Sequence, residues 1–273
     1  MSSVQSIFLL SDHTGITVES LVKALLGQFD RVDTHSAVYP FLDTPDKVAN
    51  IIAKINDAAH IHKKQPLVFS SMVNVQLRAQ LLACDARVFD IFDTFLPALS
   101  QSLHAPSNSN VGRAHGMGDS QTYDQRLAAV NFALQYDDGG KIKGLEQADL
   151  ILIGVSRSGK TPTCLYMAMQ YNVFAANYPL TEDDLTGEQL PAVLRPYRAK
   201  LIGLDIAADR LHHIREERRA GSHYANLVQC QRETKAAKAL YQNNQIPYLG
   251  STDYSIEELA TAIMQRRHVT RMV

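Results

Sequence analysis

The sequence predicts an α/β fold with two domains, the first of them built on a parallel sheet. Short apolar runs typical of buried strands alternate with longer segments whose apolar residues recur at helical spacing. A glycine-rich turn of phosphate-binding type, 154-GVSRSGKT-161, follows one such run and precedes a helical segment. A polar stretch without periodicity, 104-HAPSNSNVGRAHGMGDS-120, interrupts this alternation. We therefore predict an N-terminal parallel-sheet α/β domain over residues 1–104 and a P-loop-containing α/β domain over 105–273.

The first domain is predicted to alternate strands and helices throughout. Val18, Leu21, Val22 and Leu25 place one apolar face on its first helix. The predicted strands are 7–10, an extended 34–42, 67–73 and 87–91, and the predicted helices are 17–29, one opened by Thr44 and Pro45, 75–83, and 94–103 with an interruption near Pro97.

The second domain continues the alternation. Ser255 and Glu258 form a capping box that predicts the start of the last helix. The predicted strands are 148–153, 172–180, 200–205 and 246–249, the predicted helices are 122–136, one following residue 161, 209–219 and 255–267, and 182–198 is predicted as a polar connection.

Composition narrows the class of protein. With 273 residues, of which 45% are hydrophobic and 20% charged, the chain is expected to be soluble and globular. A net charge of −1 gives no electrostatic reason to expect nucleic acid or an anionic membrane as partner. The three cysteines lack C-x-x-C spacing, which indicates a reducing compartment without a zinc site. No apolar run has the length of a membrane span and the N-terminus lacks signal-peptide features, so we expect a cytoplasmic protein.

The 154–161 turn has the residues that a nucleotide's phosphates require. Gly154 and Gly159 let the backbone curl so that successive N–H groups point at phosphate oxygens, and the following helix adds its dipole. Lys160 brings a charge to the terminal phosphates, and the Thr161 hydroxyl is a ligand for Mg²⁺. The predicted nucleotide-binding residues are Gly154, Val155, Ser156, Arg157, Ser158, Gly159, Lys160 and Thr161.

Other polar residues have two interpretations each. Asp137 and Asp138 are followed by two glycines, and the favoured interpretation is that they mark an exposed turn. The alternative is that one of them supplies a proton acceptor or a metal-water ligand. Arg113 and His115 are either solvated loop residues or phosphate and substrate contacts. Asp12, after the first strand, is either a helix cap or a ligand.

A strand-terminal acid and a basic segment also have two interpretations. Asp205 is either an ordinary strand end or a second magnesium contact. The segment 209–219 reads as a solvated helix face, although its arginines could meet a phosphorylated protein partner.

Several segments together resemble a known family. They are 11-SDHTGIT-17, 123-YDQRLAAVNFAL-134 ending in DDG, 154-GVSRSGKTPT-163, 175-AANYPL-180 and 255-SIEELA-260. In combination they resemble the phosphoenolpyruvate synthase regulatory proteins, which are relatives of the pyruvate, phosphate dikinase regulatory proteins. The resemblance extends from the first loop to the last helix.

The resemblance implies a bifunctional enzyme. In that family, ADP phosphorylates a threonine of the target enzyme and inactivates it, and AMP is released. Inorganic phosphate then attacks the phosphothreonine, which releases pyrophosphate and restores activity. The resemblance therefore implies ADP as donor, Mg²⁺, inorganic phosphate as co-substrate, and phosphoenolpyruvate synthase as the protein partner.

The resemblance also assigns roles to residues. Lys160 would stabilise developing charge, and Asp137 or Asp138 would accept the proton. Arg157 would orient the transferring group, the attacking phosphate or the phosphothreonine. Arg113, His115 and Arg126, which match the family's pattern, would form a phosphate pocket, with Asp12 as a further substrate candidate. The chain departs from the family's pattern at two positions. His13 occupies a position where the family is expected to have glycine, and Asp205 occupies a position where it is expected to have threonine. Asp205 is therefore not carried over as a magnesium ligand.

Two rival functions explain part of the chain. A P-loop small-molecule kinase would account for residues 148–170 but leaves the first domain unexplained. A non-catalytic nucleotide-sensing regulator would bind ADP without forming phosphothreonine. Composition does not reveal the assembly, and a homodimer is the default expectation from the most common closed symmetry.

Overall fold

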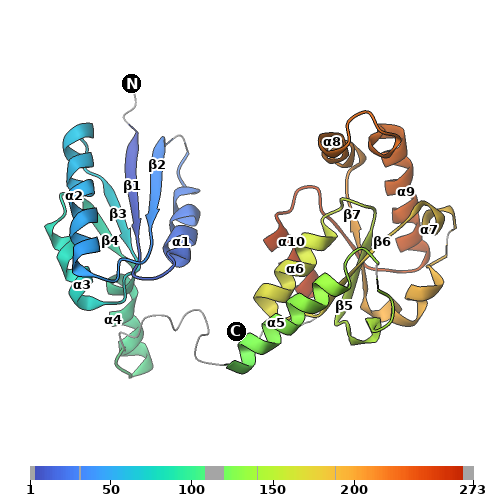
Figure 1. Cartoon of the computed structure of the whole chain (residues 1–273), viewed down its shortest axis with the longest axis horizontal. Helices are drawn as coiled ribbons and strands as arrows, with labels where there is room; N and C mark the ends of the chain where they lie inside the picture. Colours follow the sequence, from blue (N-terminus) through green and yellow to red (C-terminus); the bar gives the residue numbers. More distant parts are fainter. Residues whose placement is uncertain (1–3, 31, 108–119, 140, 188, 267–273) are drawn as a thin grey trace. The chain divides into compact units, whose positions relative to one another are not determined.

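The computed structural model describes residues 4–30, 32–107, 120–139, 141–187 and 189–266. The chain divides into two compact units, Met1–Gly118 and Asp119–Val273. Figure 1 shows the helices and strands of both units.

The first unit is built on a four-stranded sheet of parallel strands with the order β2-β1-β3-β4. The strands are β1 (Gln5–Leu10), β2 (Thr34–Tyr39), β3 (Leu67–Ser70) and β4 (Arg87–Asp90). The helices are α1 (Ile16–Leu26), α2 (Pro45–His62), α3 (Val75–Ala79), which continues into the 3₁₀ turn η1 (Gln80–Ala83), and α4 (Ile91–Leu103). Because parallel neighbours need a crossover, each strand is followed by helix before the next strand begins.

Helices cover both faces of this sheet. On one face, Phe8, Leu10 and Val68 pack against apolar residues of α2 and α3. On the other, Ile7 and Leu9 pack against α1. The alternation of consecutive β1 residues between the two clusters is the period of a strand buried on both sides.

The second unit repeats this plan, with parallel strands in the order β6-β5-β7-β8. The strands are β5 (Leu150–Gly154), β6 (Ala175–Pro179), β7 (Leu201–Asp205) and β8 (Tyr248–Gly250). The helices are α5 (Ser120–Gln135), α6 (Lys160–Tyr171), α7 (Glu182–Thr186), α8 (Ala208–Arg218), α9 (Leu227–Asn243) and α10 (Ile256–Arg266), with 3₁₀ turns η3 (Leu145–Gln147), η4 (Ala192–Lys200) and η5 (His223–Ala225).

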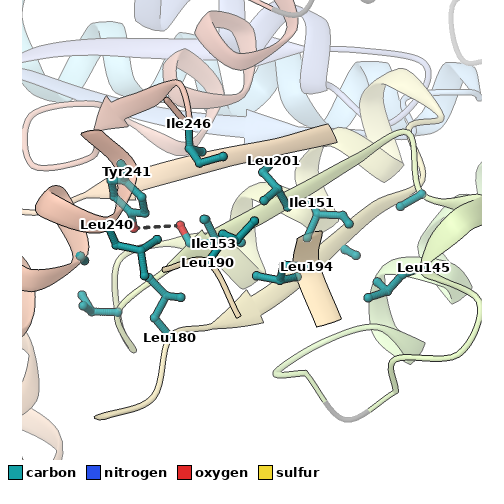
Figure 2. Packing of buried hydrophobic residues seen from close by; sticks show 14 of the residues in the cluster. Leu145, Ile151, Ile153, Leu180, Leu190, Leu194, Leu201, Leu240, Tyr241 and Ile246 are labelled. Atoms are coloured by element: carbon teal, nitrogen blue, oxygen red, sulfur yellow. Dashed lines mark hydrogen bonds between the residues drawn. The ribbon is translucent and has the colours of Figure 1, made fainter. Parts of the chain in front are cut away.

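The core of the second unit lies on both faces of its sheet. Leu150 and Leu152 face α5, α6 and α10, whereas Ile151 and Ile153 face a cluster that includes α8, α9 and η4. Figure 2 shows this second cluster, in which the Tyr241 hydroxyl of α9 lies beside the end of β5. That hydroxyl donates to the Ile153 carbonyl oxygen (3.3 Å) or the Leu204 carbonyl oxygen (3.2 Å), so α9 is fixed to two neighbouring strand ends.

The predicted α/β class is confirmed by these two parallel sheets. Two local predictions were wrong, and one helix was not predicted. The helix predicted to break near Pro97 runs unbroken over α4, because the carbonyl that loses its donor belongs to exposed Asp93, which water can satisfy. The connection predicted over 182–198 contains α7, which a Thr181 capping box begins, and most of η4. Helix α9, in a stretch for which no element was predicted, is longer than any other helix of the second unit in the described ranges.

Within the described part of the chain, no helix combines the length and the apolar character needed to cross a membrane.

Candidate functional site

The 154–161 loop joins the carboxyl end of β5 to the start of α6. Gly159 caps α6 with φ +93°, a left-handed conformation that glycine adopts without strain. A Cβ on Gly154 would lie 2.9 Å from the Leu204 carbonyl oxygen, so only glycine fits where the loop leaves the sheet. Arg157 also has a positive φ, +75°, which is uncommon for a residue with a side chain. The loop is thus a tight turn at the helix N-terminus, as predicted from its glycines.

Lys160 is buried within the loop that it belongs to. Its ammonium nitrogen donates to the Val155 carbonyl oxygen at 2.8 Å. Burial lowers the pKa of Lys160 to about 8, although the charges of Asp138 and Asp137 act in the opposite direction. The site therefore holds an ammonium group that is poorly solvated and close to two carboxylates.

A polar cluster forms where the first turn of α6 meets the segment after α5. The Thr161 hydroxyl donates to Asp137 Oδ1 at 2.9 Å. Asn177 of β6 donates from Nδ2 to the same carboxylate oxygen at 2.5 Å, and its Nδ2 also lies 2.9 Å from Thr161 Oγ1. The backbone of β6 completes the cluster, since Gly139 donates to the Asn177 carbonyl oxygen. Three segments that are distant in sequence thus position Asp137 beside Thr161.

Asp138 has a different environment from its neighbour. It is exposed, adopts a left-handed φ of +51°, and lines a cavity of about 260 Å³. The other lining residues are Ser156, Arg157, Gly159, Lys160, Thr161 and Pro162. The structure therefore separates the two carboxylates that the sequence left equivalent: Asp137 is hydrogen-bonded to Thr161, and Asp138 borders the cavity.

A second cavity, of about 500 Å³, is also lined by Ser156. Its lining includes Arg215, Tyr224 and two acids, Glu182 and Glu233. Arg215 forms an ion pair with Glu233 at 2.7 Å, which leaves the charge of Glu182 uncompensated. The lining of this cavity therefore has excess negative charge. Electrostatics therefore favours the first cavity over the second for a phosphate group.

Magnesium would fit beside the first cavity. Mg²⁺ is usually bound by one or two protein oxygens together with phosphate oxygens and water. The Thr161 hydroxyl and the Asp137 carboxylate provide two such oxygens within 2.9 Å of each other. In the described ranges, no group of three or more His, Cys, Asp or Glu residues is arranged to hold a metal by itself.

The remaining predicted residues either lie outside the described part of the chain or have other surroundings. Arg113 and His115 lie outside the described residues. Arg126, on α5, lines neither cavity. Asp12 lies in the first unit, where its Oδ2 accepts from the Val73 and Asn74 N–H groups. Asp205 forms an ion pair with Lys238 at 3.2 Å.

Four residues near the loop were missed by sequence reasoning: Asn177, Arg215, Tyr224 and Glu233. Asn177 had a signal, because a polar residue inside the predicted strand 172–180 is unusual in a buried position. Arg215 was expected on a solvated helix face or in contact with a phosphorylated protein partner, whereas its side chain is fully buried. Nothing in the spacing of the sequence pairs it with Glu233.

Comparison with known proteins places these features in context. A family model described as "Kinase/pyrophosphorylase" matches residues 7–264. Proteins of Marinobacter nauticus and Legionella pneumophila are each 46% identical to the chain, over 94% of its length and 95% of theirs. A protein of Halorhodospira halophila is 46% identical over the whole of both chains. All three have the name "Putative phosphoenolpyruvate synthase regulatory protein".

Proposed function

Because the chain belongs to the kinase/pyrophosphorylase family, we propose that it phosphorylates a threonine of phosphoenolpyruvate synthase with ADP and removes that phosphate with inorganic phosphate. The names of its relatives support the target. The first cavity supports the chemistry, because Lys160, Thr161 and Asp138 all line it. This convergence is the observation on which the proposal rests.

In the forward reaction, the threonine oxygen attacks the β-phosphorus of ADP. The bond from that phosphorus to the bridging oxygen breaks, and AMP leaves with the bridging oxygen. The loop N–H groups and Lys160 would stabilise the charge that develops on the phosphoryl oxygens. Thr161 and Asp137 would hold Mg²⁺, which when bound neutralises charge on the phosphates.

Asp138 is the better candidate for accepting the threonine proton. Its carboxylate borders the cavity and accepts only a long hydrogen bond from Asn177 (3.4 Å), whereas one oxygen of Asp137 accepts from both Thr161 (2.9 Å) and Asn177 (2.5 Å). A general base needs access to the proton that it removes, so exposure favours Asp138. We therefore propose Asp138, and not Asp137, as the general base.

In the reverse regulation, an oxygen of inorganic phosphate attacks the phosphorus of phosphothreonine. The bond from phosphorus to the threonine oxygen breaks, the threonine oxygen takes up a proton, and pyrophosphate forms. Protonated Asp138 would supply that proton, which reverses its role in the forward step. One cavity would therefore serve both directions, with Arg157 at its edge as the contact for the incoming phosphate.

Intact-protein mass spectrometry tests the proposal directly. Phosphoenolpyruvate synthase, preincubated with phosphoenolpyruvate, is exposed to this protein with ADP or with ATP. We expect the mass of one phosphate on threonine with ADP, and its loss with formation of pyrophosphate when phosphate is added. Absence of modification with either nucleotide would reject the proposal. Calorimetric titration with ADP would then distinguish a nucleotide-binding regulator from a protein that does not bind ADP.

A further inference from the structure

Arg215 of α8 is fully buried (0% exposed) although a guanidinium is charged at all ordinary pH values. Its Nη2 lies 2.7 Å from Glu233 Oε2 and its Nη1 lies 3.2 Å from Glu233 Oε1, so the pair is bidentate. Burial disfavours the charge, but the hydrogen bonds and charge of Glu233 outweigh it and raise the pKa of Arg215. Glu233 of α9 thus fixes the guanidinium in place.

The same guanidinium reaches the 154–161 loop. Nη2 donates to the Ser156 carbonyl oxygen at 3.1 Å, and Nη1 donates to the Tyr224 carbonyl oxygen at 2.9 Å. The guanidinium carbon also lies 4.0 Å from the centre of the Tyr224 ring. Tyr224 in turn contacts the loop, because its hydroxyl lies 2.9 Å from Ser156 Oγ. Ser156 is therefore held through both its carbonyl group and its side chain.

The orientation of the Ser156 carbonyl determines the orientation of the next N–H group. None of the described peptide bonds is cis, and in a trans peptide the C=O and the following N–H point in opposite directions. The carbonyl points to Arg215, which lines the second cavity. The Arg157 N–H consequently points away from Arg215. Ser156 and Arg157 both line the first cavity. Arg157 has its uncommon positive φ at this same place.

We propose that Arg215 is a positioning residue of the phosphate-binding loop, which holds the Ser156 peptide so that the Arg157 N–H is directed at a phosphate of a nucleoside diphosphate. The inference depends on the proposed function, since it assigns the first cavity to the phosphates of ADP. Arg215 touches no reacting atom in this proposal. It acts by holding the peptide plane between Ser156 and Arg157.

Calorimetric titration of the full chain with ADP and, separately, with pyrophosphate tests the inference. Variant Arg215→Met removes the hydrogen bonds to Ser156 and Tyr224 while keeping an unbranched side chain. We expect binding of both ligands to weaken by about 10- to 100-fold, the range of a lost hydrogen bond to a charged group. Arg215→Lys keeps the charge but loses the planar fork, so we expect it to recover part of the affinity.

Leu211→Ala is the matched control. Leu211 lies on the same helix and is fully buried, but it belongs to the apolar cluster beneath the sheet. Its truncation lowers thermal stability without removing a contact to Ser156, so we expect ligand affinity within about twofold of the wild type. Equal losses of affinity in Arg215→Met and Leu211→Ala would show that Arg215 acts only through stability, and would overturn the inference.

Two further outcomes are decisive. If Arg215→Met does not fold, Arg215→Lys and Glu233→Gln replace it, and unchanged affinity in both would overturn the inference. If the wild type binds pyrophosphate but not ADP, the ADP-dependent function fails while the pyrophosphate series still decides the role of Arg215. A wild type that binds neither ligand would overturn both. In amide NMR spectra, the Arg157 N–H should shift on pyrophosphate addition in Leu211→Ala but not in Arg215→Met.

Discussion

The ammonium nitrogen of Lys160 donates to the carbonyl oxygen of Val155, 2.8 Å away and five positions earlier in the same loop. The Ser158 N–H donates to the same oxygen at 3.3 Å. The lysine side chain is thus folded back over its own loop. It remains close to the cavity, which its side chain helps to line.

Anion binding should depend on pH through Lys160. Its pKa in the folded protein is lowered to about 8, and a bound polyphosphate favours the charged ammonium and raises that pKa. Affinity for ADP should therefore fall as pH rises through about 8, because binding then requires proton uptake. Calorimetry at pH 9 in buffers of different ionisation enthalpy should detect this uptake. Equal affinity at pH 7 and pH 9.5 would contradict the prediction.

Replacement of Lys160 by methionine should abolish phosphoryl transfer without destabilising the fold. Folding lowers the pKa of Lys160, so the charged lysine destabilises the folded state below pH 8. This destabilisation disappears as the pH rises from 8 to the pKa that the lysine has in the unfolded chain. At pH 7, Lys160→Met should therefore melt at the same temperature as the wild type or higher, with a gain of up to about 3 kcal/mol. Thermal unfolding and the mass-spectrometric transfer assay measure the two effects separately. A large loss of stability would show that the Val155 hydrogen bond holds the loop together.

Asp138→Asn and Asp137→Asn should have different kinetic effects. Loss of the general base at Asp138 should lower the rate of threonine phosphorylation by about 10²- to 10⁴-fold with little change in ADP affinity. Asp137→Asn should instead raise the Mg²⁺ concentration needed for activity, because Asp137, which is hydrogen-bonded to Thr161, is a proposed magnesium ligand. Magnesium titrations of initial rates compare the two variants. The reverse pattern would exchange the roles of the two residues.

Gly154→Ala should destabilise the second unit by about 1–3 kcal/mol, the usual cost of overpacking. The added methyl would lie 2.9 Å from both the Leu204 carbonyl oxygen and Ser158 Oγ. Gly250→Ala is the matched control, since an added Cβ at Gly250 has nothing within 4 Å. Chemical denaturation of both variants checks the difference. Equal stability would show that the loop moves away from Leu204 at little cost.

Prediction from the sequence succeeded where a local pattern determines the structure. The alternation of short apolar runs with helical segments identified all eight strands that the structure describes, and the glycines of the 154–161 loop predicted its turn at the start of a helix. The differing environments of Asp137 and Asp138 could not be predicted, because Asn177 and Thr161 reach Asp137 from distant positions. Helix α9 was missed because Gln, Thr, Lys and Asn conceal the helical spacing of Ala237, Leu240 and Tyr241.

The parallel order β6-β5-β7-β8 has a consequence for how the protein is made. No two neighbouring strands are joined by a hairpin, so each pairing must wait until a crossover segment has left the ribosome. The 154–161 loop is synthesised before the groups that lie against it, because Leu204, Arg215 and Tyr241 all come from later parts of the chain. A nascent chain would therefore contain the whole glycine-rich sequence well before the loop has these contacts, and the nucleotide binding that we propose should begin only once α9 has been released.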